Sequence, residues 1–253
     1  MPLQALSAFT DNYIWTLADT AGRAVVVDPG EAAPVLDAVA AGLQPVAILL
    51  THHHPDHIGG TAELLRRWPG LPVFAPDDER IDLPCRRVAA DDQVDAGEWQ
   101  FRVLAIPGHT RSHIAFIGHG QLFCGDTLFS LGCGRMFEGT PTQMLASLDS
   151  LAALPAATRV CCGHEYTLAN AAFARVVDPD NAALRRRTEE AIAMRDDDRP
   201  TLPSLLGDEL AANPFLRVDS PAVRAAVAGR LGREPADRVE TFAALRSWKD
   251  GFA

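Results

Sequence analysis

The sequence predicts an α+β protein with a larger first domain, residues 1–165, and a smaller helical domain, residues 166–253. Through the first two thirds of the chain, short apolar runs rich in β-branched residues alternate with amphipathic patterns, which indicates strands alternating with helices. Beyond about residue 166 the apolar spacing becomes helical throughout. A length of 253 residues fits one large domain or two unequal ones.

The elements follow from these patterns in chain order. Strands are expected within the apolar runs at 23–30, 45–50, 71–76, 101–108, 113–118, 121–126 and 159–164. Helices are expected at 31–43, which has helical spacing and a Gly near its end, and at 61–68. The smaller domain should hold a helix, turn and helix over 167–198 and two further helices at 220–232 and 237–252.

Four of the predicted strands end in a loop that carries His or Asp. The first loop reads "THHHPDH" from Thr51, and the others follow as "PGHT", "CGDT" and "CGHE". Loops at the ends of strands in a rigid sheet are where scaffolds usually hold chemically active side chains. We therefore expect one site assembled from these four loops.

Composition narrows the classes of protein. The net charge of −10 argues against nucleic acid as a partner, because such binding needs a basic surface. No apolar run approaches the roughly 20 residues of a membrane span, and the first residues lack a secretion signal, so we expect no membrane partner and a cytoplasmic location. The five cysteines show no CxxC pair, which favours reduced and mostly buried thiols.

The loops offer seven candidate metal ligands with nitrogen or oxygen donors. They are His52, His54, Asp56, His57, His109, Asp126 and His164. Seven donors are too many for one tetrahedral ion and about right for two ions that share a carboxylate. Imidazole and carboxylate donors suit zinc, iron or manganese, and we expect two divalent ions per chain, with zinc as the first choice.

The pattern HxHxDH in "HHHPDH", followed by "PGHT", "GDT" and "GH", resembles the metallo-β-lactamase superfamily. The resemblance covers roughly residues 1–165 and implies an αββα sandwich with a metal site at one edge of its sheets. It also implies an assignment of ligands: His52, His54 and His109 for the first metal, Asp56, His57 and His164 for the second, and Asp126 as the bridge.

The whole chain, including the helical domain, resembles the hydroxyacylglutathione hydrolases, also called glyoxalase II. The stretches that carry this resemblance are "AFTDNYIW", "LFSLGCGRMFEGT", "CGHEYT", "NPFLR" and "RSWKDGF". By resemblance the substrate is a glutathione thioester, an anion that would meet Arg135, Arg246, Lys249, Tyr166 and Asn170. Arg246 and Lys249 are three residues apart in a helical pattern and should share a face.

The reaction that the resemblance implies is hydrolysis of S-D-lactoylglutathione to glutathione and D-lactate, the second step of methylglyoxal detoxification. Hydroxide bridging the two metals would attack the thioester carbonyl, with Asp56, His57 and Asp126 as the catalytic ligands. The expected partner is this small thioester alone, and a monomer is expected. Two alternatives stay open: a glutathione persulfide dioxygenase with one iron, and a metal-binding protein without catalytic activity.

Several neighbouring residues receive lesser roles. Asp28, which ends an apolar run, is expected to brace the His-rich loop, and His113 is a candidate for a hydrogen bond behind the ligands. His53 is interpreted as a spacer and His119 as a turn residue. The sequence departs from the hydrolase pattern at Arg135, where Lys is common, and at Phe137, where Tyr is common; these departures leave the glutathione affinity open, and the chemistry is expected to be the same.

Overall fold

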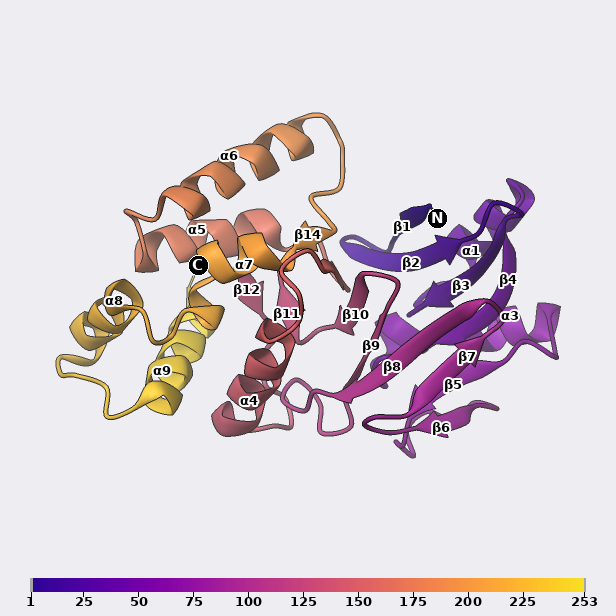
Figure 1. Cartoon of the computed structure of the whole chain (residues 1–253), viewed down its shortest axis with the longest axis horizontal. Coiled ribbons are helices and arrows are strands. Elements are labelled where there is room, and N and C mark those ends of the chain that lie inside the picture. The colour runs from indigo at the N-terminus through magenta and orange to yellow at the C-terminus, as the bar shows by residue number, and fades with distance from the viewer. Residues whose placement is uncertain (1, 253) are drawn as a thin grey trace. The chain divides into compact units, whose positions relative to one another are not determined.

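The computed structural model describes residues 2–252, which form two compact units (Figure 1). The first unit contains the chain up to Ala105 together with residues 112–125 and 161–164. The second contains residues 106–111, 126–160 and the chain from Glu165 onward. The first unit therefore lies wholly before residue 165, whereas the second takes segments from both sides of that boundary. The division of domains at that residue stays a prediction.

A six-stranded sheet forms one half of the first unit, in the order β1-β2-β3-β4-β5-β6. Its strands are β1 (Leu3–Ala8), β2 (Asn12–Ala18), β3 (Arg23–Val27), β4 (Gln44–Leu49), β5 (Val73–Pro76) and β6 (Arg86–Val88). The pairs from β3 to β6 are parallel, and the first three strands run antiparallel to one another. Strand β3 and the second half of β4 are buried, as expected of strands packed on both faces.

Two helices, α1 (Ala33–Ala40) and α3 (Thr61–Arg67), pack against one face of this sheet, and the short α2 (Pro55–Ile58) precedes α3. Val35 of α1 and Leu64 of α3 join Ile14, Val26 and Ile48 in one buried apolar cluster. Both connections cross from one parallel strand to the next, which is the usual reason for a helix at that point in the chain.

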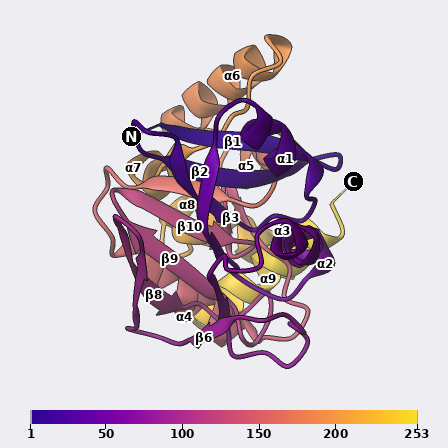
Figure 2. The ribbon, with the colours of Figure 1, turned by 90° about the vertical axis from the view of Figure 1, so that its right-hand side faces the viewer.

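The second sheet of this unit is an antiparallel meander, in which β8, β9 and β10 lie side by side (Figure 2). Its strands are β7 (Gln93–Ala96), β8 (Trp99–Ala105), β9 (Ile114–Gly118) and β10 (Gln121–Gly125), with the end of β13 (Arg159–Cys162) beyond β10. Backbone hydrogen bonds join the loops of the two sheets at one edge. Tyr13 N donates to Gly163 O at 2.8 Å and Ile114 N donates to Thr51 O at 3.0 Å.

Helices dominate the second unit (Figure 1). They are α4 (Pro141–Ala152), α5 (Thr167–Val177), α6 (Ala182–Asp196), α7 (Leu206–Ala212), the 3₁₀ turn η1 (Pro214–Leu216), α8 (Pro221–Leu231) and α9 (Arg238–Asp250). Thr140 and Gln143 form a reciprocal capping box at the start of α4, and Asn181 caps α6. A two-stranded hairpin, β11 (Leu128–Phe129) and β12 (Gly132–Cys133), and the short β14 (Ser204–Leu205) complete the unit.

The predicted elements are all present, usually one to three residues shorter than the sequence pattern. The elements that the sequence pattern did not predict are the first two strands, the helices α2, α4 and α7, the 3₁₀ turn η1, the 128–133 hairpin, and the short strands β6, β7 and β14. Among the described residues, no helix is long and apolar enough to cross a membrane. Four of the five cysteines are buried, as expected, and Cys85 is half-buried.

Candidate active site

The His-rich loop, residues 51–57, follows β4 directly, and the buried carboxylate of Asp28 holds it in place. Asp28 accepts hydrogen bonds from the backbone N–H of Thr51 at 2.8 Å and from its hydroxyl at 2.6 Å. The same carboxylate lies 3.0 Å from Nδ1 of His57. Asp28 has φ of +51°, a conformation that Asp tolerates better than most residues. The expectation that Asp28 braces the loop is therefore confirmed.

Three proposed ligands of one metal converge within the first unit. Donor atoms of Asp56, His57 and His164 all lie within 4.8 Å of one another. Oδ2 of Asp56 is 3.5 Å from Nε2 of His57 and 3.4 Å from Nε2 of His164. Asn12 Nδ2 donates to the Asp56 carboxylate at 3.0 Å and so limits its rotation.

Both of these imidazoles turn the same ring nitrogen toward the cluster. Nδ1 of His57 faces Asp28, and Nδ1 of His164 lies 2.8 Å from Oδ1 of Asp11. A carboxylate can only accept, so each Nδ1 carries the proton and each Nε2 keeps its lone pair for a cation. Carboxylates behind metal-bound imidazoles orient ligands in this way. The donor set fits a divalent ion.

His52 and His54 lie together in the same unit. Nε2 of His52 is 3.1 Å from Nδ1 of His54, and Nδ1 of His52 is 3.0 Å from the Thr51 hydroxyl. The ring of His113 stacks on His52 with centroids 4.5 Å apart, and its own Nδ1 lies 3.1 Å from the carbonyl oxygen of Ile114. His113 thus supports the ring of a proposed ligand by packing against it.

The other two histidines lie where the sequence suggested. His53 packs edge-on against the ring of His54, with centroids 4.7 Å apart, and its Nδ1 lies 3.5 Å from Oδ2 of Asp78. His119 has φ of +53° in the turn after β9, and its Nε2 accepts a hydrogen bond from Gln100 N.

His109 and Asp126 belong to the second unit and also lie next to each other. Nε2 of His109 is 3.5 Å from Oδ2 of Asp126, and Nδ1 of His109 donates to the carbonyl of Arg135 at 2.8 Å. Gly134 passes so close that a Cβ there would lie 1.8 Å from the carbonyl oxygen of Asp126, so only glycine fits. The segment from Asp126 to Arg135 therefore holds both side chains in place.

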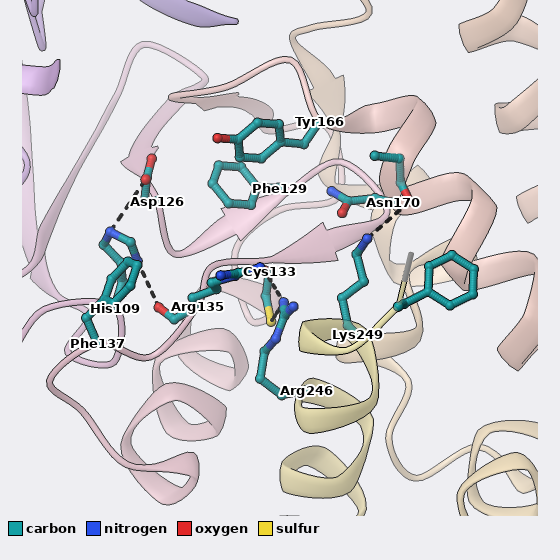
Figure 3. A pocket seen from close by; sticks show the side chains of 12 residues that line it. His109, Asp126, Phe129, Cys133, Arg135, Phe137, Tyr166, Asn170, Arg246 and Lys249 are labelled. Atoms are coloured by element: carbon teal, nitrogen blue, oxygen red, sulfur yellow. Dashed lines mark hydrogen bonds and ion pairs between the residues drawn. The ribbon is translucent and has the colours of Figure 1, made fainter. Parts of the chain in front are cut away.

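A cavity of about 420 Å³ opens beside this pair within the second unit (Figure 3). His109, Asp126 and Phe137 lie at one side of it, and Asn170, Arg246 and Lys249 lie at the other. Its remaining lining residues are Phe129, Cys133, Arg135, Tyr166, Ala169 and Phe252. All five residues predicted to contact the substrate thus gather around one cavity.

Away from Asp126, the cavity carries three cationic side chains and lies near one further carboxylate, that of Asp250. The buried guanidinium of Arg246 donates to the carbonyl of Cys133 at 2.6 Å and to Oδ1 of Asp250 at 3.1 Å. Nε of Arg135 is 3.5 Å from the same oxygen, and Nζ of Lys249 donates to the carbonyl of Ala169 at 3.3 Å. One carboxylate against three cations leaves this end of the cavity positive, which suits an anionic ligand.

Two groups in the cavity have perturbed acidity. Burial, and then the charges of Arg246 and Arg135, lower the pKa of Lys249. Burial raises the pKa of the Cys133 thiol to about 11, although the guanidinium of Arg246 acts in the opposite direction. Cys133 is therefore a neutral wall residue at neutral pH, and a bound anion would favour the charged form of Lys249.

Several contributors to these sites were not identified from the sequence. Asp11 and Asn12 support the metal-facing side chains, and Asp250 contacts two cavity arginines. Phe129 and Cys133 line the cavity. Each sits inside a stretch quoted for the family resemblance, "AFTDNYIW", "RSWKDGF" or "LFSLGCGRMFEGT". That resemblance was the only available signal, because none of these residues has a distinctive spacing of its own.

Two family models together match almost the whole chain. Residues 12–164 match the model of the metallo-β-lactamase superfamily, and residues 165–252 match that of the hydroxyacylglutathione hydrolase C-terminus. A hydroxyacylglutathione hydrolase from Xylella fastidiosa is 60% identical over 252 residues, covering 100% of this chain and 98% of the relative.

Solved structures share the fold. BLEG-1 B3 metallo-β-lactamase superposes with a TM-score of 0.64 at 24% identity, over 84% of this chain and 98% of that one, and shows the shared fold. TTHA1623 in a di-iron-bound form is 31% identical, with a TM-score of 0.55, over 65% of this chain and 92% of that one. The expected αββα sandwich with a C-terminal helical region is confirmed.

The family fold and the convergent His and Asp donors together support divalent metal ions as the cofactor. Full-length identity of 60% and the C-terminal family model agree with the cationic cavity and the imidazole clusters. The chain therefore belongs to the hydroxyacylglutathione hydrolases, the glyoxalase II branch of the metallo-β-lactamase superfamily.

Proposed function

We propose that the protein hydrolyses S-(2-hydroxyacyl)glutathione, with S-D-lactoylglutathione as the physiological substrate. The observation that carries this is the cavity of the second unit, which has two proposed metal ligands, His109 and Asp126, at one side and the cationic groups of Arg246 and Lys249 at the other. A glutathione thioester has the matching shape: a reactive acyl group on sulfur, and two carboxylates on the peptide arms.

We assign the metal ligands as the sequence suggests. His52, His54 and His109 would hold one ion, and Asp56, His57 and His164 would hold the other. Asp126 would bridge the two. Zinc is the proposed metal, because four-coordinate His and Asp sites suit it, and iron or manganese would be accepted by the same donors.

Two such ions, when bound, acidify a water molecule and polarise the carbonyl that it attacks. Asp28 and Asp11 hold a proton on Nδ1 of His57 and His164 and keep both imidazoles turned with Nε2 toward the cluster. In the overall reaction the acyl carbon gains the oxygen of water and loses the sulfur, which leaves with the bonding electron pair. No strong general acid is required, because a thiol has a pKa of about 8.5.

Arg246 and Lys249 would pair with carboxylates of the glutathione moiety, and Arg135 would add charge at the mouth of the cavity. Asn170 and Tyr166 would contact the peptide. The amide Nδ2 of Asn170 already donates to the carbonyl of Ser130 at 3.1 Å, and the ring of Tyr166 packs edge-on against Phe129, so both side chains are held before the ligand arrives. This preorganisation lowers the entropic cost of binding.

Two alternatives remain. The first is a dioxygenase that oxidises glutathione persulfide at a single iron, and the second is a metal-binding protein without catalytic activity. Purified protein with counted metals should hydrolyse S-D-lactoylglutathione rapidly with close to two ions per chain. No turnover despite full loading, together with oxygen uptake on glutathione persulfide, would replace the proposal by the first alternative. Inactivity with both substrates and no binding of S-alkyl glutathione would favour the second. A cytoplasmic location and a monomeric state are part of the proposal.

A further inference from the structure

The hairpin of β11 and β12 forms one wall of the cavity and joins its two ends. Phe129 and Cys133 come from its two strands and line the cavity, and Arg135 follows two residues later. Asp126, which also lines the cavity, lies two residues before β11. The conformation of this hairpin therefore decides where both groups of side chains point.

The turn of the hairpin is unusual for its sequence. Leu131 has φ of +57°, a left-handed conformation that costs a residue with a Cβ roughly 1–2 kcal/mol and is normally given to glycine. Its side chain is fully buried and packs with Ala171, Ala174 and Leu184 of helices α5 and α6. Such a turn persists only if surrounding groups hold it there.

Two polar residues from the C-terminal part of the chain hold the turn. The fully buried carboxylate of Glu209, on α7, accepts the backbone N–H of Leu131 at 2.7 Å. Nδ2 of Asn213, one residue after α7, donates to the carbonyls of Phe129 at 3.1 Å and Gly132 at 3.0 Å. The same amide donates to Glu209 at 3.2 Å, so the two side chains act as one unit.

A purely structural role explains Glu209 poorly. Burying a carboxylate costs free energy, and a well-packed apolar side chain of the same size would avoid that cost. What an apolar side chain lacks is an acceptor for the N–H of Leu131. Without that acceptor, the N–H would be buried and unsatisfied, and the turn would relax toward an ordinary φ value. Phe129 and Cys133 would then move.

We propose that Glu209 and Asn213 are positioning residues for the glutathione cavity: they hold, from behind, the hairpin that lines it. This inference rests on the proposed function, because the affected ligand is the glutathione moiety. The side chains act 78 and 84 residues along the chain from the backbone atoms they hold. The C-terminal helices thus shape the cavity from behind and also supply two of its cations, Arg246 and Lys249.

The test compares variants that lose the Glu209 acceptor or the Asn213 donor with variants that keep these hydrogen bonds to the hairpin. Glu209→Met removes the acceptor at nearly constant size, and Glu209→Gln keeps one oxygen for the N–H of Leu131. Asn213→Ala removes the donors. Its matched control is Asn181→Ala, because Asn181 also caps a helix of this unit and its Nδ2 donates to Ala211 O, away from the hairpin. Val227→Ala, in the buried face of α8, controls for general loss of stability.

Each variant is loaded with zinc, its metals are counted, and binding of S-hexylglutathione is measured by calorimetry beside kcat and KM for S-D-lactoylglutathione. We expect Glu209→Met and Asn213→Ala to raise both the Kd and KM by about tenfold or more, with metal content retained and kcat changed by less than about threefold. Glu209→Gln should bind within about threefold of the wild type. Both control variants should lose thermal stability and keep their affinity.

Wild-type affinity in a folded Glu209→Met variant would overturn the inference, as would an equal loss of affinity in Asn213→Ala and Asn181→Ala. If Glu209→Met fails to fold, the comparison of Asn213→Ala with Asn181→Ala still tests the inference. These outcomes leave the proposed function standing as long as the wild type binds and hydrolyses its thioester. A wild type that does neither would contradict the proposed function and this inference together.

Discussion

Replacing Asp28 by Asn should weaken metal binding by changing which nitrogen of His57 carries the proton. Asp28 accepts three hydrogen bonds, two from Thr51 and one from Nδ1 of His57. In the Asp28→Asn variant one acceptor oxygen becomes an NH2 donor. If this donor faces the backbone N–H of Thr51, two fixed donors collide. If it faces His57, the imidazole must accept at Nδ1 and move its proton to Nε2, the atom that the metal needs.

The second arrangement is cheaper, because the Thr51 hydroxyl can rotate and the imidazole can change tautomer. The loss is one hydrogen bond to a charged group, about 1.5–3 kcal/mol, which corresponds to roughly 10- to 150-fold in affinity. That range agrees with the roughly 10- to 100-fold effect typical of residues that orient metal ligands. We therefore expect Asp28→Asn to lose the ion held by His57 first and to retain closer to one metal than two.

Zinc affinity and stoichiometry are measured by competition with a chromophoric chelator. Asp19→Asn is the matched control, since the Asp19 carboxylate also accepts three hydrogen bonds, from Ala21 N, Arg23 N and Arg23 Nε, and these lie away from the histidines. That variant should bind two ions like the wild type. Two ions bound by Asp28→Asn with wild-type affinity would refute the tautomer argument.

Three other predictions concern charge in the second unit. Because the pKa of Lys249 lies below 10.5, affinity for S-hexylglutathione should fall as pH rises toward that value, and Lys249→Arg should remove the part of this fall that comes from loss of the lysine charge. Lys249 is the only lysine in the sequence, so one ¹⁵N-lysine signal reports its titration. If bound S-hexylglutathione does not raise the pKa of Lys249, the proposed pairing with a glutathione carboxylate is contradicted. Asp250→Asn keeps an acceptor for Arg246 and removes the negative charge, so calorimetry should show S-hexylglutathione bound about fivefold more tightly. The control variant Asp180→Asn should bind like the wild type, and weaker binding by Asp250→Asn would contradict the prediction. Burial raises the pKa of Glu209, so its protonated form is favoured by folding and its contribution to stability falls as pH rises above the ordinary carboxyl value. Glu209→Gln should therefore gain melting temperature relative to the wild type from pH 5 to pH 8, and parallel melting curves would contradict this.

The parts of the fold that the sequence predicted have strong local signals. Strands β3 and β4 read as continuous apolar runs and are buried where they approach the site, and the His-rich loop follows the second of them. Helix α4 also had local signals that the prediction missed: the Thr140 and Gln143 capping box, Pro at its first position, and buried apolar residues at helical spacing. The first two strands carry mixed polar and apolar residues and lack the alternation that identifies a strand.

The parts that could not be predicted depend on contacts far apart in the chain. The 128–133 hairpin has Leu131 at the position where a turn signal would require Gly, and it is held by side chains 78 and 84 residues away. Asp250 has no local signal of a role at the site, and only the fold brings it to Arg135. The family resemblance identified the substrate-binding residues, whereas composition and spacing alone supplied the metal donors.

The most direct test of glutathione thioester hydrolysis is a comparison of kcat/KM for two lactoyl thioesters on the zinc-loaded protein. One is S-D-lactoylglutathione, and the other is the D-lactoyl thioester of N-acetylcysteamine, which has the same reacting bond and no carboxylate. We expect the glutathione thioester to be preferred by at least about 100-fold, and Arg246→Met to reduce that preference while leaving the small thioester unaffected. Equal kcat/KM for the two thioesters would contradict recognition of glutathione by the cationic cavity, and no hydrolysis of either would contradict the thioesterase itself.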